Sequence, residues 1–125
     1  MGRAQMLHTL WEAVSRGELD ALASALAPDA CWRAVEDGPW NCSGRPRIIE
    51  VLSANIERIR SGALEEALEV GDRVVVAFRP GGGHEPTWPL DHGRRYVVVS
   101  FRSALISELK GCVDREAALS YAAAG

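Results

Sequence analysis

The stretch LHTLWEAVSRGELDALASALAPDACW, residues 7–32, decides the fold because it predicts two short helices that lead directly into a strand. Apolar residues recur at three- and four-residue intervals on both sides of Gly17, which is the spacing of one helix face. Gly17 ends the first helix as a C-cap glycine, and Pro28 closes the second. Helices joined this tightly predict an αα-hairpin or a bent pair. Their stripes are Leu7, Leu10, Trp11 and Val14, then Leu19, Leu22, Ala23 and Leu26.

Residues 30–36 alternate in the manner of a strand with mixed character on both faces. Residues 37–39, Asp-Gly-Pro, break this strand. Trp32, Ala34 and Glu36 share one face, and Cys31, Arg33 and Val35 share the other.

The longest helix is predicted to begin at an N-cap on Ser43, with Pro46 in its first turn, and to end at Gly62. Its expected buried stripe is Ile49, Leu52, Ile56 and Ile59.

The rest of the chain is mostly β. Strands are expected over residues 64–70, 73–79, 94–102 and 105–113, with two-residue turns at 71–72 and 103–104 and a Gly- and Pro-rich loop over 80–93. Asp114 is the expected N-cap of a short helix that ends near Ala123. The order α-α-β-α-β-β-β-β-α predicts an α+β fold in a single domain, residues 1–125.

Composition excludes several classes of function. With 14 basic and 17 acidic residues, the net charge of −3 disfavours nucleic-acid binding. Apolar runs of only a few residues exclude a membrane span, and the N-terminus lacks a signal peptide pattern, so we expect a cytoplasmic protein. Three cysteines without paired spacing predict neither a disulfide framework nor a metal centre, and we expect no cofactor.

The order and spacing of several short segments resemble the nuclear-transport-factor-2-like superfamily, in its SnoaL-like branch. The resemblance implies a cone-shaped curved antiparallel sheet, cystatin-like, wrapped around helices with an apolar pocket at the open end. Members of this superfamily often form homodimers through the outer face of the sheet, so the resemblance also implies a homodimer of this kind. The segments are residues 11–22 (WEAVSRGELDAL), 27–32 (APDACW), 42–45 (CSGR), 71–76 (GDRVVV), 93–96 (GRRY) and 106–108 (ISE) leading to Asp114.

The chemistries of this superfamily give different expectations for the site. A ketosteroid isomerase needs a tyrosine and a carboxylate where this chain has Leu10 and Ala34, so that chemistry is not expected. An epoxide hydrolase needs two carboxylates around an arginine, for which Glu36 and Glu108 with Arg33 or Arg102 are the candidates. A dehydratase would need a His–carboxylate pair, and His84 and His92 lie in the loop beside Glu85 and Asp91.

The leading interpretation is a SnoaL-like protein that binds a small apolar or aromatic molecule. Trp11 and Trp32 are expected as pocket wall, and Trp40 and Trp88 as residues of the rim. Tyr96 would add to the wall, and Glu36, with Arg33 or Arg102, would supply the polar contacts. One alternative is an isomerase, dehydratase, polyketide cyclase or epoxide hydrolase that uses Glu36 as general acid or base, with Glu108 as a second candidate catalytic residue. The other alternative is an interaction module that dimerises through its sheet.

Overall fold

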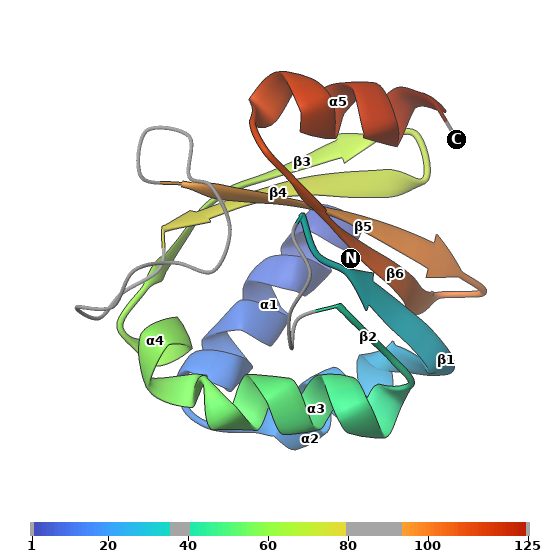
Figure 1. Ribbon diagram of the computed structural model, residues 1–125. Coiled ribbons are helices and arrows are strands. Elements are labelled where there is room, and N and C mark those ends of the chain that lie inside the picture. Colours follow the sequence, from blue (N-terminus) through green and yellow to red (C-terminus); the bar gives the residue numbers. More distant parts are fainter. Residues whose placement is uncertain (1, 36–40, 80–93, 125) are drawn as a thin grey trace.

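The computed structural model describes residues 2–35, 41–79 and 94–124, apart from the side chain of Arg58. In these ranges a six-stranded, curved sheet has the order β2-β1-β6-β5-β4-β3 (Figure 1). Only β1 and β6 pair in parallel, whereas all other neighbours are antiparallel. The strands are β1 (Leu26–Arg33), β2 (Cys42–Ser43), β3 (Ala63–Val70), β4 (Arg73–Arg79), β5 (Arg95–Arg102) and β6 (Leu105–Cys112).

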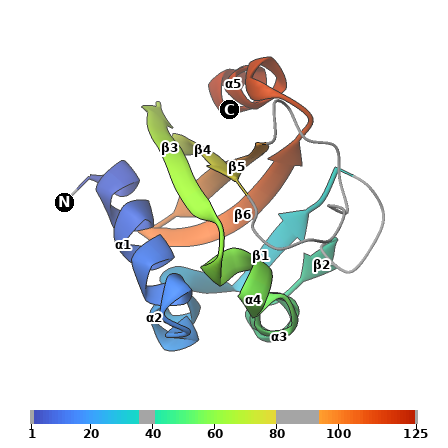
Figure 2. The same cartoon turned by 90° about the vertical axis from the view of Figure 1, so that its left-hand side faces the viewer.

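Helices cover the two faces of the sheet unequally. Four of them lie on one side, and α5 (Arg115–Ala124) packs on the other side against β4, β5 and β6 (Figures 1 and 2). Below, the first side is called the inner face and the side under α5 the outer face. The helices of the inner face are α1 (Arg3–Ser15), α2 (Leu19–Ala25), α3 (Arg45–Ala54) and α4 (Ile56–Arg60). The predicted α+β class is therefore confirmed.

The central strands are buried on both faces, which explains their unbroken valine runs. Successive side chains of a strand point to opposite faces, so each run supplies two hydrophobic clusters at once. The inner cluster includes Val74, Val76, Val97, Val99 and Ile106. The outer cluster includes Val75, Ala77, Tyr96, Val98 and Cys112, together with Ala118 and Ala122 of α5.

The predicted turns are confirmed. Gly17 has a φ of 83° directly after α1, and Gly71 has a φ of 59° in the β3–β4 hairpin. Ser103 and Ala104 both have positive φ, 52° and 70°, which is the backbone of a type I′ hairpin turn. Asp114 caps α5, because its Oδ1 accepts a hydrogen bond of 2.8 Å from the backbone N–H of Ala117.

The second helix and the first strand meet earlier than predicted. β1 begins at Leu26, which the periodicity assigns to the helix, and it ends at Arg33 rather than at residue 36. Leu26 pairs in register with Ile106 of β6, and the register shifts between Leu26 and Cys31. This early start depends on a partner strand about eighty residues away along the chain, so no local sequence pattern predicts it.

The predicted long helix is divided in two. α3 ends at Ala54 and α4 begins at Ile56, with Asn55 between them at φ −116° and ψ 18°. The Asn55 amide Nδ2 donates to the Val51 carbonyl at 2.8 Å, a local bond that competes with the continuing helix. The N-cap of α3 is Gly44, at φ 92°, because Ser43 belongs to β2. The buried residues of α3 are Ile48, Val51 and Leu52. Of the expected stripe in this helix only Leu52 is buried, because Ile48 rather than Ile49 faces the core.

The outer face keeps some exposed apolar area beside α5. In the described ranges, the large hydrophobic residues that stay exposed are Leu68 of β3 and Val113. Homodimerisation through this face stays a prediction.

None of the described helices has the length and apolar character that crossing a membrane requires.

We predict that Asp114→Ala lowers the free energy of unfolding by about 1 kcal/mol, because the first turn of α5 loses its side-chain cap. Urea unfolding followed by circular dichroism measures the change. Asp114→Asn is the matched control, because asparagine caps helices as well as aspartate does. Equal losses in both variants would show that the carboxylate charge, rather than the capping bond, stabilises α5.

Candidate functional site

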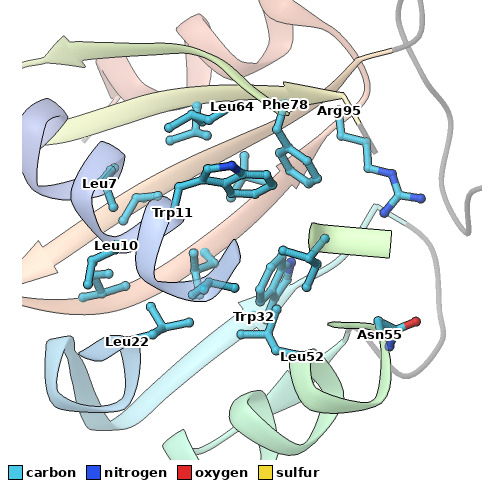
Figure 3. A pocket seen from close by; sticks show the side chains of 17 residues that line it. Leu7, Leu10, Trp11, Leu22, Trp32, Leu52, Asn55, Leu64, Phe78 and Arg95 are labelled. Atoms are coloured by element: carbon cyan, nitrogen blue, oxygen red, sulfur yellow. The ribbon is translucent and has the colours of Figure 1, made fainter. Parts of the chain in front are cut away.

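A cavity of about 130 Å³ lies on the inner face, between the helices and the curved sheet (Figure 3). All but two of its lining residues are apolar. The lining comes from nine helices and strands, some of them far apart in sequence, and from Asn55 between α3 and α4. α1 supplies Leu7, Leu10, Trp11 and Val14. These four are the complete stripe predicted for the first helix.

Side chains alternate between the two faces of each strand, and this determines which strand residues line the cavity. Those of β5 are Arg95, Val97 and Val99, and those of β4 are Val76 and Phe78. Each chosen residue is two positions from the next, as strand geometry requires.

Two aromatic residues expected in the pocket do line it. The Trp11 ring lies 5.6 Å from the Phe78 ring, centroid to centroid, at a tilt of 45°. Trp32 projects from β1 into the lining and is 8% exposed. Ala34, which was expected on the same face, packs against the same inner cluster.

Two polar residues of the lining, Arg95 and Asn55, were missed by the sequence reasoning. Arg95 is 4% exposed, and Asn55 reaches the lining from the break between α3 and α4. Figure 3 places both at one end of the pocket, while Leu10 and Leu22 lie towards the other end. For Arg95 a signal was available, because it alternates with Val97 and Val99. For Asn55 no signal existed, because the long helix was expected to continue through it.

Glu108 and Arg33 lie on the opposite side of the sheet from this cavity. The Arg33 Nε is 3.0 Å from a Glu108 carboxylate oxygen, and the other Glu108 oxygen accepts a hydrogen bond from the Tyr121 hydroxyl of α5. Arg73 donates to the Tyr121 carbonyl at 2.7 Å, and its guanidinium stacks over the Tyr121 ring at 5.1 Å. This chain of contacts fastens α5 to β1, β4 and β6. The expectation that Glu108 and Arg33 face the pocket is therefore corrected.

Tyr96 and Arg102 also lie away from the cavity. Tyr96 is buried in the outer cluster under α5, because it alternates with the inward residue Arg95. Arg102 is exposed near the β5–β6 turn and donates to the Asp29 carboxylate, and this hydrogen bond lowers the pKa of Asp29. Neither residue contributes to the cavity wall, in contrast to expectation.

The remaining predicted site residues lie outside the described residues. They are Glu36, Trp40 and Trp88, together with His84 and His92 of the glycine-rich loop. Within the described ranges, no group of three or more His, Cys, Asp and Glu side chains is placed to hold a metal ion.

Residues 7–109 match the family model of the SnoaL-like domain. The chain belongs to this family. The match spans every residue of the cavity lining, from Leu7 to Leu109. Comparison with functionally curated proteins finds no significant match.

Solved structures support the same fold for this SnoaL-like chain. An uncharacterised cystatin-fold protein from Novosphingobium aromaticivorans is 19% identical, with a TM-score of 0.67 over 90% of this chain and 98% of that one. A putative polyketide cyclase from Sinorhizobium meliloti is 22% identical, with a TM-score of 0.63 over 86% and 94%. A de novo designed protein with a curved β-sheet is 17% identical, with a TM-score of 0.68 over 93% and 90%. At these identities the likeness establishes the fold alone.

The Tyr121 hydroxyl makes the attachment of α5 dependent on pH. Its hydrogen bond to Glu108, followed by burial, raises the pKa of Tyr121 above the ordinary value of 10.0. The protonated phenol is thus favoured in the folded state. Its contribution to stability is complete below the unfolded pKa and is lost as the pH rises through the folded pKa.

We predict that Tyr121→Phe lowers the free energy of unfolding by about 1 kcal/mol at pH 7, because Glu108 loses a hydrogen bond. The gap between wild type and variant should narrow once the pH passes the raised pKa. Urea unfolding of both proteins at neutral and strongly alkaline pH measures this gap. A gap that stays constant with pH would contradict the role given to the phenol proton.

Proposed function

We propose that this protein binds a small apolar molecule in the inner-face cavity. The observation that carries the proposal is a cavity of about 130 Å³ with a lining that is apolar except at Arg95 and Asn55. Ligand pockets generally have this composition, with mostly hydrophobic walls and a few polar groups that orient the ligand.

The size of the cavity supports a ligand of about one aromatic ring. Protein interiors normally contain few voids larger than a water molecule, because lost dispersion contacts make voids costly. An apolar cavity of roughly 150 Å³ in another protein stays dry and takes up benzene. A cavity of similar size is therefore suited to a small apolar guest rather than to water.

The rings at the wall favour a flat guest. Trp11 and Phe78 contact each other at the lining, and Trp32 of β1 contributes a third ring to the lining. Aromatic rings gain about 0.5–1.5 kcal/mol from edge-to-face or offset contacts beyond the burial of their area. An aromatic ligand would gain such contacts here.

We predict that Leu64→Trp weakens binding of ethylbenzene at least about tenfold, because the larger side chain takes up cavity space on β3. Isothermal titration calorimetry measures the affinity. In the wild type it should also show a negative heat-capacity change, which marks the burial of apolar surface.

Leu68→Trp is the matched control for this substitution. Leu68 lies on the same strand but is 38% exposed and does not line the cavity. It should therefore bind ethylbenzene as the wild type does. Equal weakening in both variants, with unchanged melting temperatures, would place the ligand elsewhere, and no binding by the wild type to any small apolar probe would overturn the proposal.

Catalysis with Glu36 as general acid or base is the alternative function. It draws support from the putative polyketide cyclase among the similar folds and from the inward placement of Trp32 and Ala34, four and two positions before Glu36 respectively. Any compound found to bind would be incubated with wild type and with Glu36→Gln, and its conversion followed by mass spectrometry. Conversion that Glu36→Gln abolishes would support this role, and conversion that the variant leaves unchanged would exclude it.

A further inference from the structure

We propose that α4 is a movable wall of the cavity. It swings outward about Asn55 and Gly62 to admit the ligand, and contact between Ile59 and the bound molecule holds it closed again. This inference rests on the proposed function and adds the route by which the ligand enters. It also requires that α4 opens in the ligand-free protein, which is measurable without any ligand.

α4 forms one side of the cavity. It connects α3 to β3 and packs against α1 (Figures 1 and 2). The segment 55–64, which contains α4, supplies Asn55, Ile59 and Leu64 to the lining. An outward displacement of α4 therefore widens the cavity while the central strands of the sheet stay in place.

α4 is packed less deeply than its neighbours α1 and α3. Each of these two helices buries three of its side chains, whereas Ile56 and Ile59 of α4 are only half-buried. Helices shorter than about 12 residues are marginal without tertiary packing, because their few hydrogen bonds barely offset the cost of nucleation. A short segment with little buried apolar area is the kind that opens locally while the rest of the fold stays intact.

The polar contacts of α4 are local. Arg60 donates to the Glu57 carboxylate at 3.3 Å, and the Ser61 hydroxyl donates to the Glu57 carbonyl at 2.8 Å. Among the side chains that the structure describes in α4, which exclude that of Arg58, none forms a hydrogen bond or ion pair with another element. Opening therefore costs these side chains apolar contacts only.

Both ends of α4 allow a change of direction. At Asn55 the backbone N–H donates to the Leu52 carbonyl at 3.1 Å, while the side-chain Nδ2 takes the Val51 carbonyl. The Val51 carbonyl thus has a partner that does not depend on α4. At the other end Gly62 precedes β3, and glycine adopts a wide range of backbone angles. Hinges are commonly a few residues at the ends of elements that absorb such changes.

Hydrogen–deuterium exchange followed by mass spectrometry tests whether α4 opens. In the ligand-free protein we expect the amides of α4 to exchange at least about tenfold faster than those of α3 near Leu52. Ethylbenzene at about ten times its Kd should slow the exchange of α4 about tenfold, because the bound molecule favours the closed state. α5, which packs on the outer face, should change less.

Ile59→Ala and Ile56→Ala are a matched pair, because both remove the same atoms from α4 and only Ile59 lines the cavity. At equal saturation, Ile59→Ala should reduce the protection of α4 by ethylbenzene about threefold or more, since the ligand loses apolar contact with the closed state. Its dissociation should quicken by a similar factor, measured by stopped-flow fluorescence of Trp11 and Trp32. Ile56→Ala should behave as the wild type in both measurements.

The outcomes separate this inference from the proposed function. If ethylbenzene binds by calorimetry but leaves the exchange of α4 unchanged, the movable wall is overturned and the apolar pocket stands. The same holds if α4 exchanges as slowly as α3 without ligand. If both variants lose protection equally, the contact assigned to Ile59 is overturned. If no small apolar probe binds, both proposals fail. Exchange in the wild type decides the movable wall even if Ile59→Ala does not fold.

Discussion

The structure depends on the burial of β4 and β5 on both faces, with helices α1–α4 on one side and α5 on the other. Because side chains alternate along a strand, one valine-rich segment supplies the wall of the cavity and the contact surface of the C-terminal helix. A register slip of one residue would exchange these two sets and bring Arg95 under α5. The position of every wall residue of β5 follows from this single constraint.

The two faces carry different kinds of chemistry. The inner face encloses an apolar cavity with a buried cation at one end. The outer face holds α5 through the contacts of Arg33, Glu108, Tyr121 and Arg73. A charged or aromatic residue of the sheet can thus either line the cavity or hold α5. Which of these two roles it has depends on the face of the sheet that its side chain occupies.

Sequence reasoning was strongest where the pattern is local. The stripe of the first helix, the turn at Gly17, the strand over 73–79 and the cap at Asp114 depend on nearest neighbours along the chain, and the structure contains all of them. Reasoning failed where a distant partner decides. β1 starts early because of β6. Tyr96 was assigned to the wrong face, because the face of β5 that lines the cavity is set by the distant helices that cover each side of the sheet.

The amino-acid sequence by itself determined the α+β class, the order of most elements, the SnoaL-like resemblance and the presence of Trp11 and Trp32 in the pocket wall. Periodicity and turn chemistry suffice for the class and the element order, because they are properties of short segments, whereas the pocket and its wall were implied by the resemblance. Only the tertiary structure decided that Arg95 and Asn55 form the polar end of the cavity and that Glu108 and Arg33 hold α5. The physical reason is that these roles depend on which face of a curved sheet each residue occupies and on which distant element covers that face.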